Sequence, residues 1–94
     1  MIKNIPPQLI VLSVIAEYRD GITVEELVSH IERLKMKGID LGYTFASRYG
    51  NKISKELLLD LNMLKLLGLI DEVNGRYIVT EKGYNVLSRL HIQK

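Results

Sequence analysis

The stretch LGLIDEVNGRYIVTEKG, residues 67–83, decides the fold. Asn74-Gly75 is the strongest short-range signal for a β-hairpin, because both residues of the tight turn need positive φ angles. A two-residue turn there predicts three facing pairs: Val73 with Arg76, Glu72 with Tyr77, and Ile70 with Val79. Gly68 favours the end of a preceding helix, and Thr80 can cap a following one. The stretch therefore predicts a helix that ends near residue 67, a hairpin over 69–79 and a last helix over 80–91.

The composition limits what the chain can be. Its 94 residues suit a single domain, and a hydrophobic fraction of 47% with 26% charged residues is ordinary for a globular protein. The absence of cysteine excludes disulfides and thiolate metal sites. No apolar run approaches the length of a membrane span, and acidic and basic residues stand where a signal peptide would be cleaved, so we expect a soluble cytoplasmic protein.

The net charge of +2 is small, but it is unevenly distributed. Residues 1–40 carry a net charge of −1 and residues 41–94 a net charge of +3. The half that contains the hairpin therefore has a mild positive bias, which permits binding to nucleic acid without requiring it.

The first predicted helix, about residues 6–19, is apolar nearly all round. Proline is tolerated in its first turn, and Gly21 ends the run. A helix of this kind must be buried on more than one side. One interpretation is a homodimer whose interface holds Leu9, Leu12, Ile15 and Ala16, together with Leu90 of the last helix. The alternative is a central core helix covered by its own chain.

The second predicted helix covers about residues 24–36. Thr23 and Glu26 fit a capping box, and residues 21–23 ahead of it can form a short extended stub. The apolar residues that follow recur at helical spacing and predict one buried stripe: Val24, Leu27, Val28, Ile31 and Leu34.

Residues 37–53 lose this periodicity. We expect either a short helical piece around Thr44–Tyr49 or a displaced second helix, because the connection is long for two adjacent helices. Tyr43, Phe45 and Tyr49 are expected to anchor the segment to the core. The alternative is an exposed aromatic patch with Arg48 and Lys52.

The third predicted helix covers about residues 54–67, with Ser54 as its N-cap. Leu57, Leu61 and Leu64 recur at helical spacing and predict its buried side. A second side carries a narrow polar and basic strip of Ser54, Lys55, Asn62 and Lys65.

The order of these elements resembles a winged helix-turn-helix domain of small prokaryotic and archaeal transcription regulators. The most specific part is LKLLGLIDEVNGRYIVTEKGYNVL, residues 64–87, which is similar to the L-x-x-L-G-L-I, hairpin, Y-x-L/V-T-E-K-G run of those families. The resemblance implies a mainly α fold with a small β-hairpin (α+β), in which residues 54–67 form the recognition helix and residues 69–79 the wing.

A narrower likeness covers GYTFASRYGNKISKELLLDLNMLKLLGLI, residues 42–70. This segment resembles winged-helix proteins of the YwgA and Panacea type, with Asn51 in the place of their usual proline. Some of those proteins act through protein partners, so this resemblance implies a fold rather than one activity.

The winged-helix resemblance implies binding to double-stranded DNA as a homodimer, and with it regulation of transcription. The third helix would enter the major groove and the hairpin would act as a wing. The candidate contacts are Arg48, Lys52, Ser54, Lys55, Asn62, Lys65 and Arg76. Four carboxylates in the same region oppose phosphate binding: Glu56, Asp60, Asp71 and Glu72.

Two other classes of function remain. A protein-interaction module is indicated by apolar residues on the third helix beyond what its core side needs: Leu58, Leu59, Met63, Leu66 and Leu67. An enzyme is disfavoured, because His30 and His91 are the only histidines and the sequence has no catalytic motif. Glu26 and His30 are one helical turn apart, but two ligands do not make a metal site, so no metal or cofactor is expected.

Overall fold

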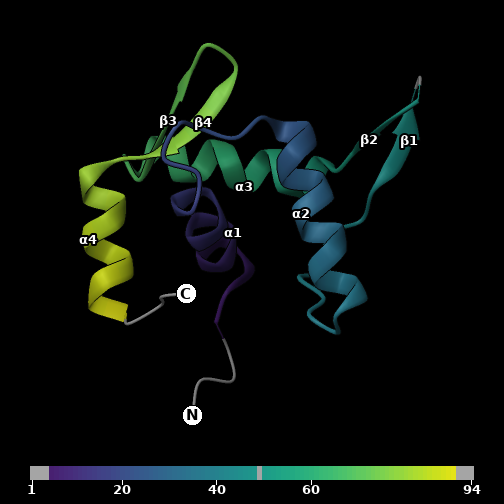
Figure 1. The fold of residues 1–94 in the computed structure, drawn as a ribbon, viewed down its shortest axis with the longest axis horizontal. Coiled ribbons are helices and arrows are strands. Elements are labelled where there is room, and N and C mark those ends of the chain that lie inside the picture. The colour runs from purple at the N-terminus through teal and green to yellow at the C-terminus, as the bar shows by residue number, and fades with distance from the viewer. Residues whose placement is uncertain (1–4, 49, 91–94) are drawn as a thin grey trace.

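The computed structural model describes residues 5–48 and 50–90, without the side chains of Arg48 and Asn51, and shows a small α+β fold. These residues form four helices and two antiparallel hairpins (Figure 1). The helices are α1 (Pro7–Ala16), α2 (Val24–Met36), α3 (Lys55–Leu66) and α4 (Glu81–Leu90). The hairpins are β1 (Ala46–Arg48) with β2 (Asn51–Ile53), and β3 (Ile70–Val73) with β4 (Arg76–Val79). No helix in the described part of the chain is long and apolar enough to cross a membrane.

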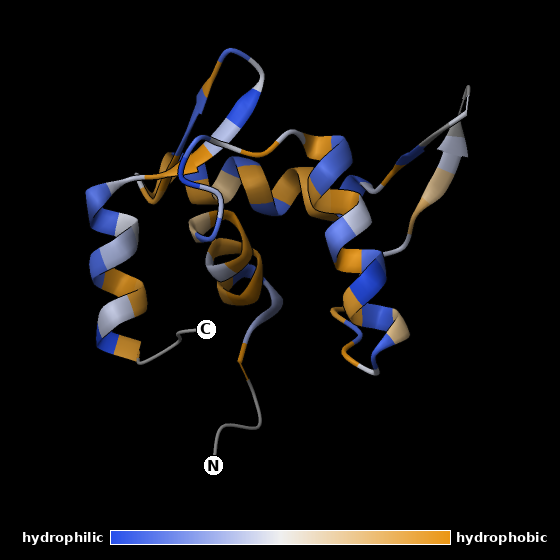
Figure 2. Cartoon of the chain, viewed as in Figure 1, coloured by the Kyte–Doolittle hydropathy of each residue, from blue (hydrophilic) through white to orange (hydrophobic). Residues whose placement is uncertain are grey.

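Helix α1 lies at the centre of the molecule, with α2 and α4 on either side of it (Figure 1). It packs against α2, α3, α4 and β4, and its five consecutive residues Val11–Ile15 are all buried. Figure 2 shows α1 and α3 coloured as hydrophobic over most of their length, whereas α2 and α4 carry many hydrophilic residues. The middle of α1 is thus covered on all sides by the chain itself.

This burial corrects part of the expected dimer interface. Leu12 and Ile15 are 0% exposed within one chain, so no surface of either side chain remains for a second copy. Leu9 and Ala16 are half-buried against the core, and Leu90 is 42% exposed. The alternative interpretation, a central core helix, describes α1. The helix also ends at Ala16 rather than near residue 19, because residues 17–21 turn back in short hydrogen-bonded turns.

The β3–β4 hairpin has the predicted register. Val73 faces Arg76, Glu72 faces Tyr77 and Ile70 faces Val79. Asn74 and Gly75 have φ angles of 53° and 77°, as the tight turn requires. The stub before α2 adds a third element, because Ile22 and Tyr77 exchange two backbone hydrogen bonds of 3.0 and 2.8 Å. The hairpin is therefore tied to the α1–α2 connection as well as to α3.

The helix caps predicted from the sequence are present. The Thr23 hydroxyl accepts a hydrogen bond from the Glu26 backbone N–H, and Glu26 accepts one from the Thr23 backbone N–H. Ser54 caps α3 by accepting from the Leu57 backbone N–H. The last turn of α3 is closed by Gly68, with a φ of 78°, and by Lys82, which donates to the Leu67 carbonyl.

Residues 37–53 differ from the expectation. A hairpin, β1–β2, stands where a helical piece or a displaced helix was predicted, and Gly50 turns it with a φ of 83°. The expected anchoring is confirmed for two of the three aromatic residues. Tyr43 is 7% exposed, and Phe45 packs against the core, whereas Tyr49 lies outside the described residues. The Tyr43 hydroxyl donates a 2.6 Å hydrogen bond to Asp60 of α3, which fixes the segment to that helix.

Candidate functional site

Helix α3 has two apolar sides. The inner side is the predicted stripe of Leu57, Leu61 and Leu64, each at most 2% exposed. The outer side carries Leu59, Met63 and Leu66, which are 67%, 55% and 89% exposed. Both stripes have the spacing four then three, and they are offset by two residues, or about 200° around the helix. The same helix therefore presents one stripe to the core and a second stripe to solvent.

The outer stripe is widened by apolar neighbours. Leu58 is 39% exposed and Leu67 is 52% exposed, on opposite sides of the stripe. Together, the five side chains leave exposed the equivalent of about three complete large apolar residues. We call Leu58, Leu59, Met63, Leu66 and Leu67 the outer patch. Single exposed leucines are ordinary on a protein surface, but five exposed large apolar residues on α3 and its C-cap are the kind of concentration that marks interaction sites.

Two polar residues share this side of α3. Lys55 and Asn62 are both exposed, and in the described part of the chain Lys55 forms no ion pair. Helical geometry places Lys55 and Lys65 to one side of the outer stripe and Glu56 and Asp60 to the other. The patch is thus bordered by cations along one flank and by carboxylates along the other.

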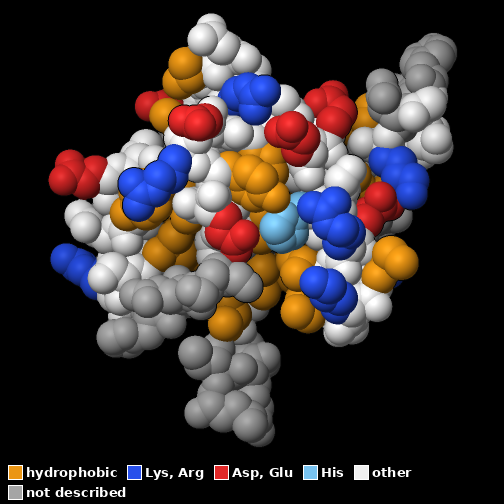
Figure 3. Space-filling view, viewed as in Figure 1, with side chains coloured by type: hydrophobic (Ala, Val, Ile, Leu, Met, Phe, Trp, Pro, Cys, Tyr) orange, Lys and Arg blue, Asp and Glu red, His pale blue; other side chains and the backbone are white. Residues whose placement is uncertain are grey.

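Two of the lysines predicted to contact DNA are engaged with carboxylates. Lys52 pairs with Glu32 at 2.7 Å, and Lys65 pairs with Glu72 at 3.1 Å. Figure 3 shows one face of the molecule, on which basic side chains have acidic ones beside them. These cations do not form a surface of a single sign.

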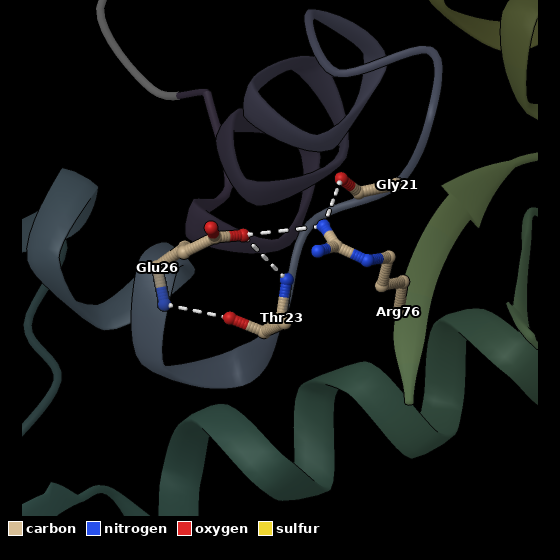
Figure 4. Close-up of polar contacts among 4 residues, drawn as sticks. All are labelled: Gly21, Thr23, Glu26 and Arg76. Carbon is tan, nitrogen blue, oxygen red and sulfur yellow. Dashed lines mark hydrogen bonds and ion pairs between the residues drawn. The ribbon is translucent and has the colours of Figure 1, made fainter. Parts of the chain in front are cut away.

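Arg76 holds the hairpin to the start of α2 (Figure 4). Its Nη1 donates to the Gly21 carbonyl oxygen at 3.3 Å and lies 3.7 Å from the Glu26 carboxylate. That carboxylate also belongs to the capping box. It accepts a hydrogen bond from the Thr23 backbone N–H, and this bond holds the Glu26 pKa below its ordinary value. We call Gly21, Thr23, Glu26 and Arg76 the clasp. Arg76 was predicted to contact DNA, and the structure gives it a contact within the fold.

Ser54 was predicted to contact DNA, and its burial corrects this prediction. It is 2% exposed, its oxygen caps the Leu57 backbone N–H, and its hydroxyl donates to Glu56 at 3.0 Å. Both hydrogen-bonding functions of the side chain are used inside the protein, so Ser54 cannot reach an external ligand. The Glu56 pKa is lowered, chiefly by a hydrogen bond from its own backbone N–H and then by the Ser54 hydroxyl. The side chain of Arg48 lies outside the description.

A hollow adjoins the start of α3. It has a volume of about 330 Å³ and is lined by Thr44, Ala46, Ser47, Ile53, Lys55 and Glu56. Its lining is mostly apolar, and it lies between the β1–β2 hairpin and the first turn of α3. From α3 it is lined only by the charged residues Lys55 and Glu56, so it is separate from the outer patch.

The chain matches no known family. Comparisons with protein-family models, with curated proteins and with solved structures found no match. The function must therefore be argued from the geometry of the surface itself.

The remaining chemistry-bearing residues in the described ranges are spread out or paired within the fold. His30 contacts the Tyr18 hydroxyl through Nδ1 at 3.0 Å, in an edge-on ring arrangement, and His91 lies outside the described residues. Among the residues that the structure describes, no three His, Asp or Glu side chains are close enough to hold a metal ion. Asp60 accepts hydrogen bonds from Tyr43 and Gln8, which accounts for its half-buried carboxylate.

Proposed function

We propose that the chain is a winged-helix protein that binds a protein partner through the outer patch of α3. The winged-helix assignment is supported by the element order, by the hairpin that directly follows α3, and by the pairing of Ile22 with β4. One departure is that α2 and α3 are joined by the β1–β2 hairpin rather than by a turn of three or four residues. A helix placed in this way need not keep the groove-reading role of a recognition helix.

The exposed apolar area of α3 carries the proposal. Complete burial of a large apolar side chain contributes about 1.5–3 kcal/mol, so burying the equivalent of about three would contribute roughly 5–9 kcal/mol on this side alone. A partner with an apolar surface of its own adds a similar term, which is enough to offset the cost of association. DNA offers much less, because its groove edges are polar apart from the thymine methyl group.

A site-specific photo-crosslink in the native host tests the proposal. The photoreactive residue benzoylphenylalanine replaces Leu66 in one variant and Met36 in a matched control, since these side chains are 89% and 87% exposed. We expect a protein adduct from position 66 that Leu59→Glu in the same chain suppresses, and no equivalent adduct from position 36. Equal labelling at the two positions, no adduct, or an adduct with DNA would refute the proposal.

DNA binding is the second candidate function, and one observation favours it. Lys55 and Asn62 lie on the outer side of α3, where a groove-bound helix would present them. The ion pairs of Lys52 and Lys65 are exposed, and such pairs contribute only about 0–1 kcal/mol, so phosphate could replace the carboxylates.

Binding to a random-sequence duplex of about 30 base pairs, measured by fluorescence anisotropy over a salt series, separates the two functions. DNA binding predicts that log K falls with log salt by about 0.9 per neutralised phosphate, and that Lys55→Glu and Lys65→Glu reduce this slope. The protein-binding proposal predicts no such dependence. An affinity that Leu66→Glu leaves unchanged while Lys55→Glu abolishes it would favour DNA.

A further inference from the structure

We propose that the partner is a second copy of this chain, and that two α3 helices pack side by side in parallel through the outer patch. This inference rests on the proposed function, whose docking surface it adopts. It also moves the dimer interface from α1, where the sequence suggested it, to α3. The parallel dimer follows in three steps, from the spacing of the stripe, from the charges on its flanks, and from the exposure of Leu59 and Leu66 in the described part of the chain.

The first step is the spacing. Leu59, Met63 and Leu66 follow one another at intervals of four and three residues, which is the seam spacing of helices that pack nearly parallel. A surface on a two-fold axis must be complementary to itself. A stripe of long, flexible apolar side chains meets this condition, because each side chain can pack beside its own copy.

The second step is the charge on the flanks, and it selects the direction. In a parallel pair related by a two-fold axis along the helices, each flank faces the opposite flank of the other copy. Lys55 of one copy then meets the side on which the exposed Glu56 of the other copy lies, and the contact occurs twice. In an antiparallel pair like flanks meet, which brings Lys55 to the basic flank of the other copy and Glu56 to its acidic flank. Charge complementarity therefore favours the parallel pair.

The third step is that the patch has no packing role among the residues that the structure describes. The core contacts of α3 are made by Leu57, Leu61 and Leu64, and the C-terminal carbonyls are closed by Gly68 and Lys82. Leu59 and Leu66 remain largely in water and add nothing to that packing. Surface positions with this degree of exposure are usually polar. A second copy removes both patches from water at once.

Sedimentation equilibrium of the full chain is the first test. We expect a dimer whose dissociation constant rises at least about 100-fold in Leu66→Glu and in Leu59→Glu, since the two-fold axis introduces each buried charge twice. Met36→Glu, at an equally exposed position on α2, should leave the dimer unchanged. Circular dichroism checks that each variant keeps the helical content of the wild type. A monomeric wild type at 1 mM, or a dimer that survives both Leu→Glu substitutions, would overturn the inference.

The direction of packing has its own test, because the chain contains no cysteine. Leu59→Cys and Leu66→Cys are made separately and oxidised alone and as a mixture. A parallel pair predicts that each variant forms a disulfide-linked dimer by itself. Dimers that form only in the mixture would show an antiparallel pair and refute the parallel arrangement.

The photo-crosslink from position 66 distinguishes failure of this inference from failure of the proposed function. An adduct with the mass of two chains supports both. An adduct with a different protein, combined with a monomeric wild type, leaves the proposed function standing and refutes the second copy as partner. No adduct, combined with a monomeric wild type, refutes both.

Discussion

Gly83→Ala should destabilise the protein, although alanine is the better helix former. Gly83 is in the first turn of α4, where the helix meets the end of β4 and the residue that precedes β3. A β-carbon added there would overlap the carbonyl oxygen of Leu69 and lie 2.6 Å from Cγ1 of Val79. The Leu69 carbonyl cannot easily move away, because it accepts a 3.0 Å hydrogen bond from the Thr80 backbone N–H. Only glycine permits this approach of helix and strand.

The magnitude follows from two opposing effects. Overpacking a well-filled site costs about 1–3 kcal/mol of stability. The added methyl group of Gly83→Ala would overlap both the Leu69 carbonyl and the Val79 side chain, so we expect a cost at the upper end of this range. Replacing glycine by alanine inside a helix returns about 1 kcal/mol. The net loss is about 2 kcal/mol, which for a chain of this length lowers Tm by about 8–16 °C.

Thermal and urea unfolding, followed by circular dichroism at 222 nm, measure this loss. Asn85→Ala is the matched control, because Asn85 is exposed on the same helix and the substitution brings only the gain in helix propensity. We expect the control to be as stable as the wild type or slightly more stable. If Gly83→Ala unfolds with the control rather than well below it, the close approach of α4 to Leu69 is wrong.

Three further predictions concern the contacts that join distant segments. Gly21→Ala should cost about 2 kcal/mol in urea unfolding, because Gly21 has a φ of 97° and its β-carbon would lie 2.7 Å from Cβ of Arg76; a stability equal to wild type would contradict this. Tyr43→Phe should cost about 1.5 kcal/mol by removing the hydrogen bond to Asp60, and in an ultraviolet pH titration it should remove a tyrosine that ionises above the ordinary tyrosine pKa, since burial and the Asp60 contact raise the Tyr43 pKa. Because the Glu26 pKa is lowered in the folded protein, ionised Glu26 stabilises the fold at pH values above the ordinary glutamate pKa, and this stabilisation is lost as the pH falls through the lowered pKa. In an acid titration, the unfolding free energy of Glu26→Gln should therefore fall less steeply with pH than that of the wild type, and identical slopes would contradict this.

The elements governed by local rules could be predicted from the sequence. Asn74-Gly75 determined the turn and register of the β3–β4 hairpin. A two-residue turn fixes which residues face each other, and the alternation of side chains along each strand then fixes which face each one lies on. Thr23 with Glu26 located the start of α2, and Ser54 located the start of α3. In each case the residues that decide the structure are neighbours in the chain.

The β1–β2 hairpin could not be predicted, because its strands are short and its support comes from elsewhere. Three residues per strand are too few to show alternation of polar and apolar positions. A two-stranded hairpin is marginal by itself, and this one packs against α2 while Tyr43, just ahead of it, bonds to Asp60. These partners are distant in sequence, so no local pattern indicates them.

The candidate site likewise has features that the sequence could indicate and features that it could not. The sequence indicated an excess of apolar residues on α3, since helical spacing alone separates Leu59 and Leu66 from the core stripe. It could not show that Arg76 belongs to the clasp, since the Gly21 carbonyl is 55 residues away. Nor could periodicity show what covers an apolar helix, which is why a dimer interface and a core position both remained open for α1 until the burial of Val11–Ile15 was known.

The contrast between α1 and α3 bears on function. Both helices are apolar over most of their surface, but α1 packs against four other elements of the chain, and folding explains the burial of its residues Val11–Ile15. The outer patch of α3 has no such explanation, because glutamate or lysine at Leu59 and Leu66 would have nearly the same helix propensity as leucine. The monomer would lose no core contact by such a change, so Leu66→Glu should unfold within about 0.5 kcal/mol of wild type when both are monomeric. A feature that folding does not need, and that lowers solubility, is best explained by what it contacts outside the fold.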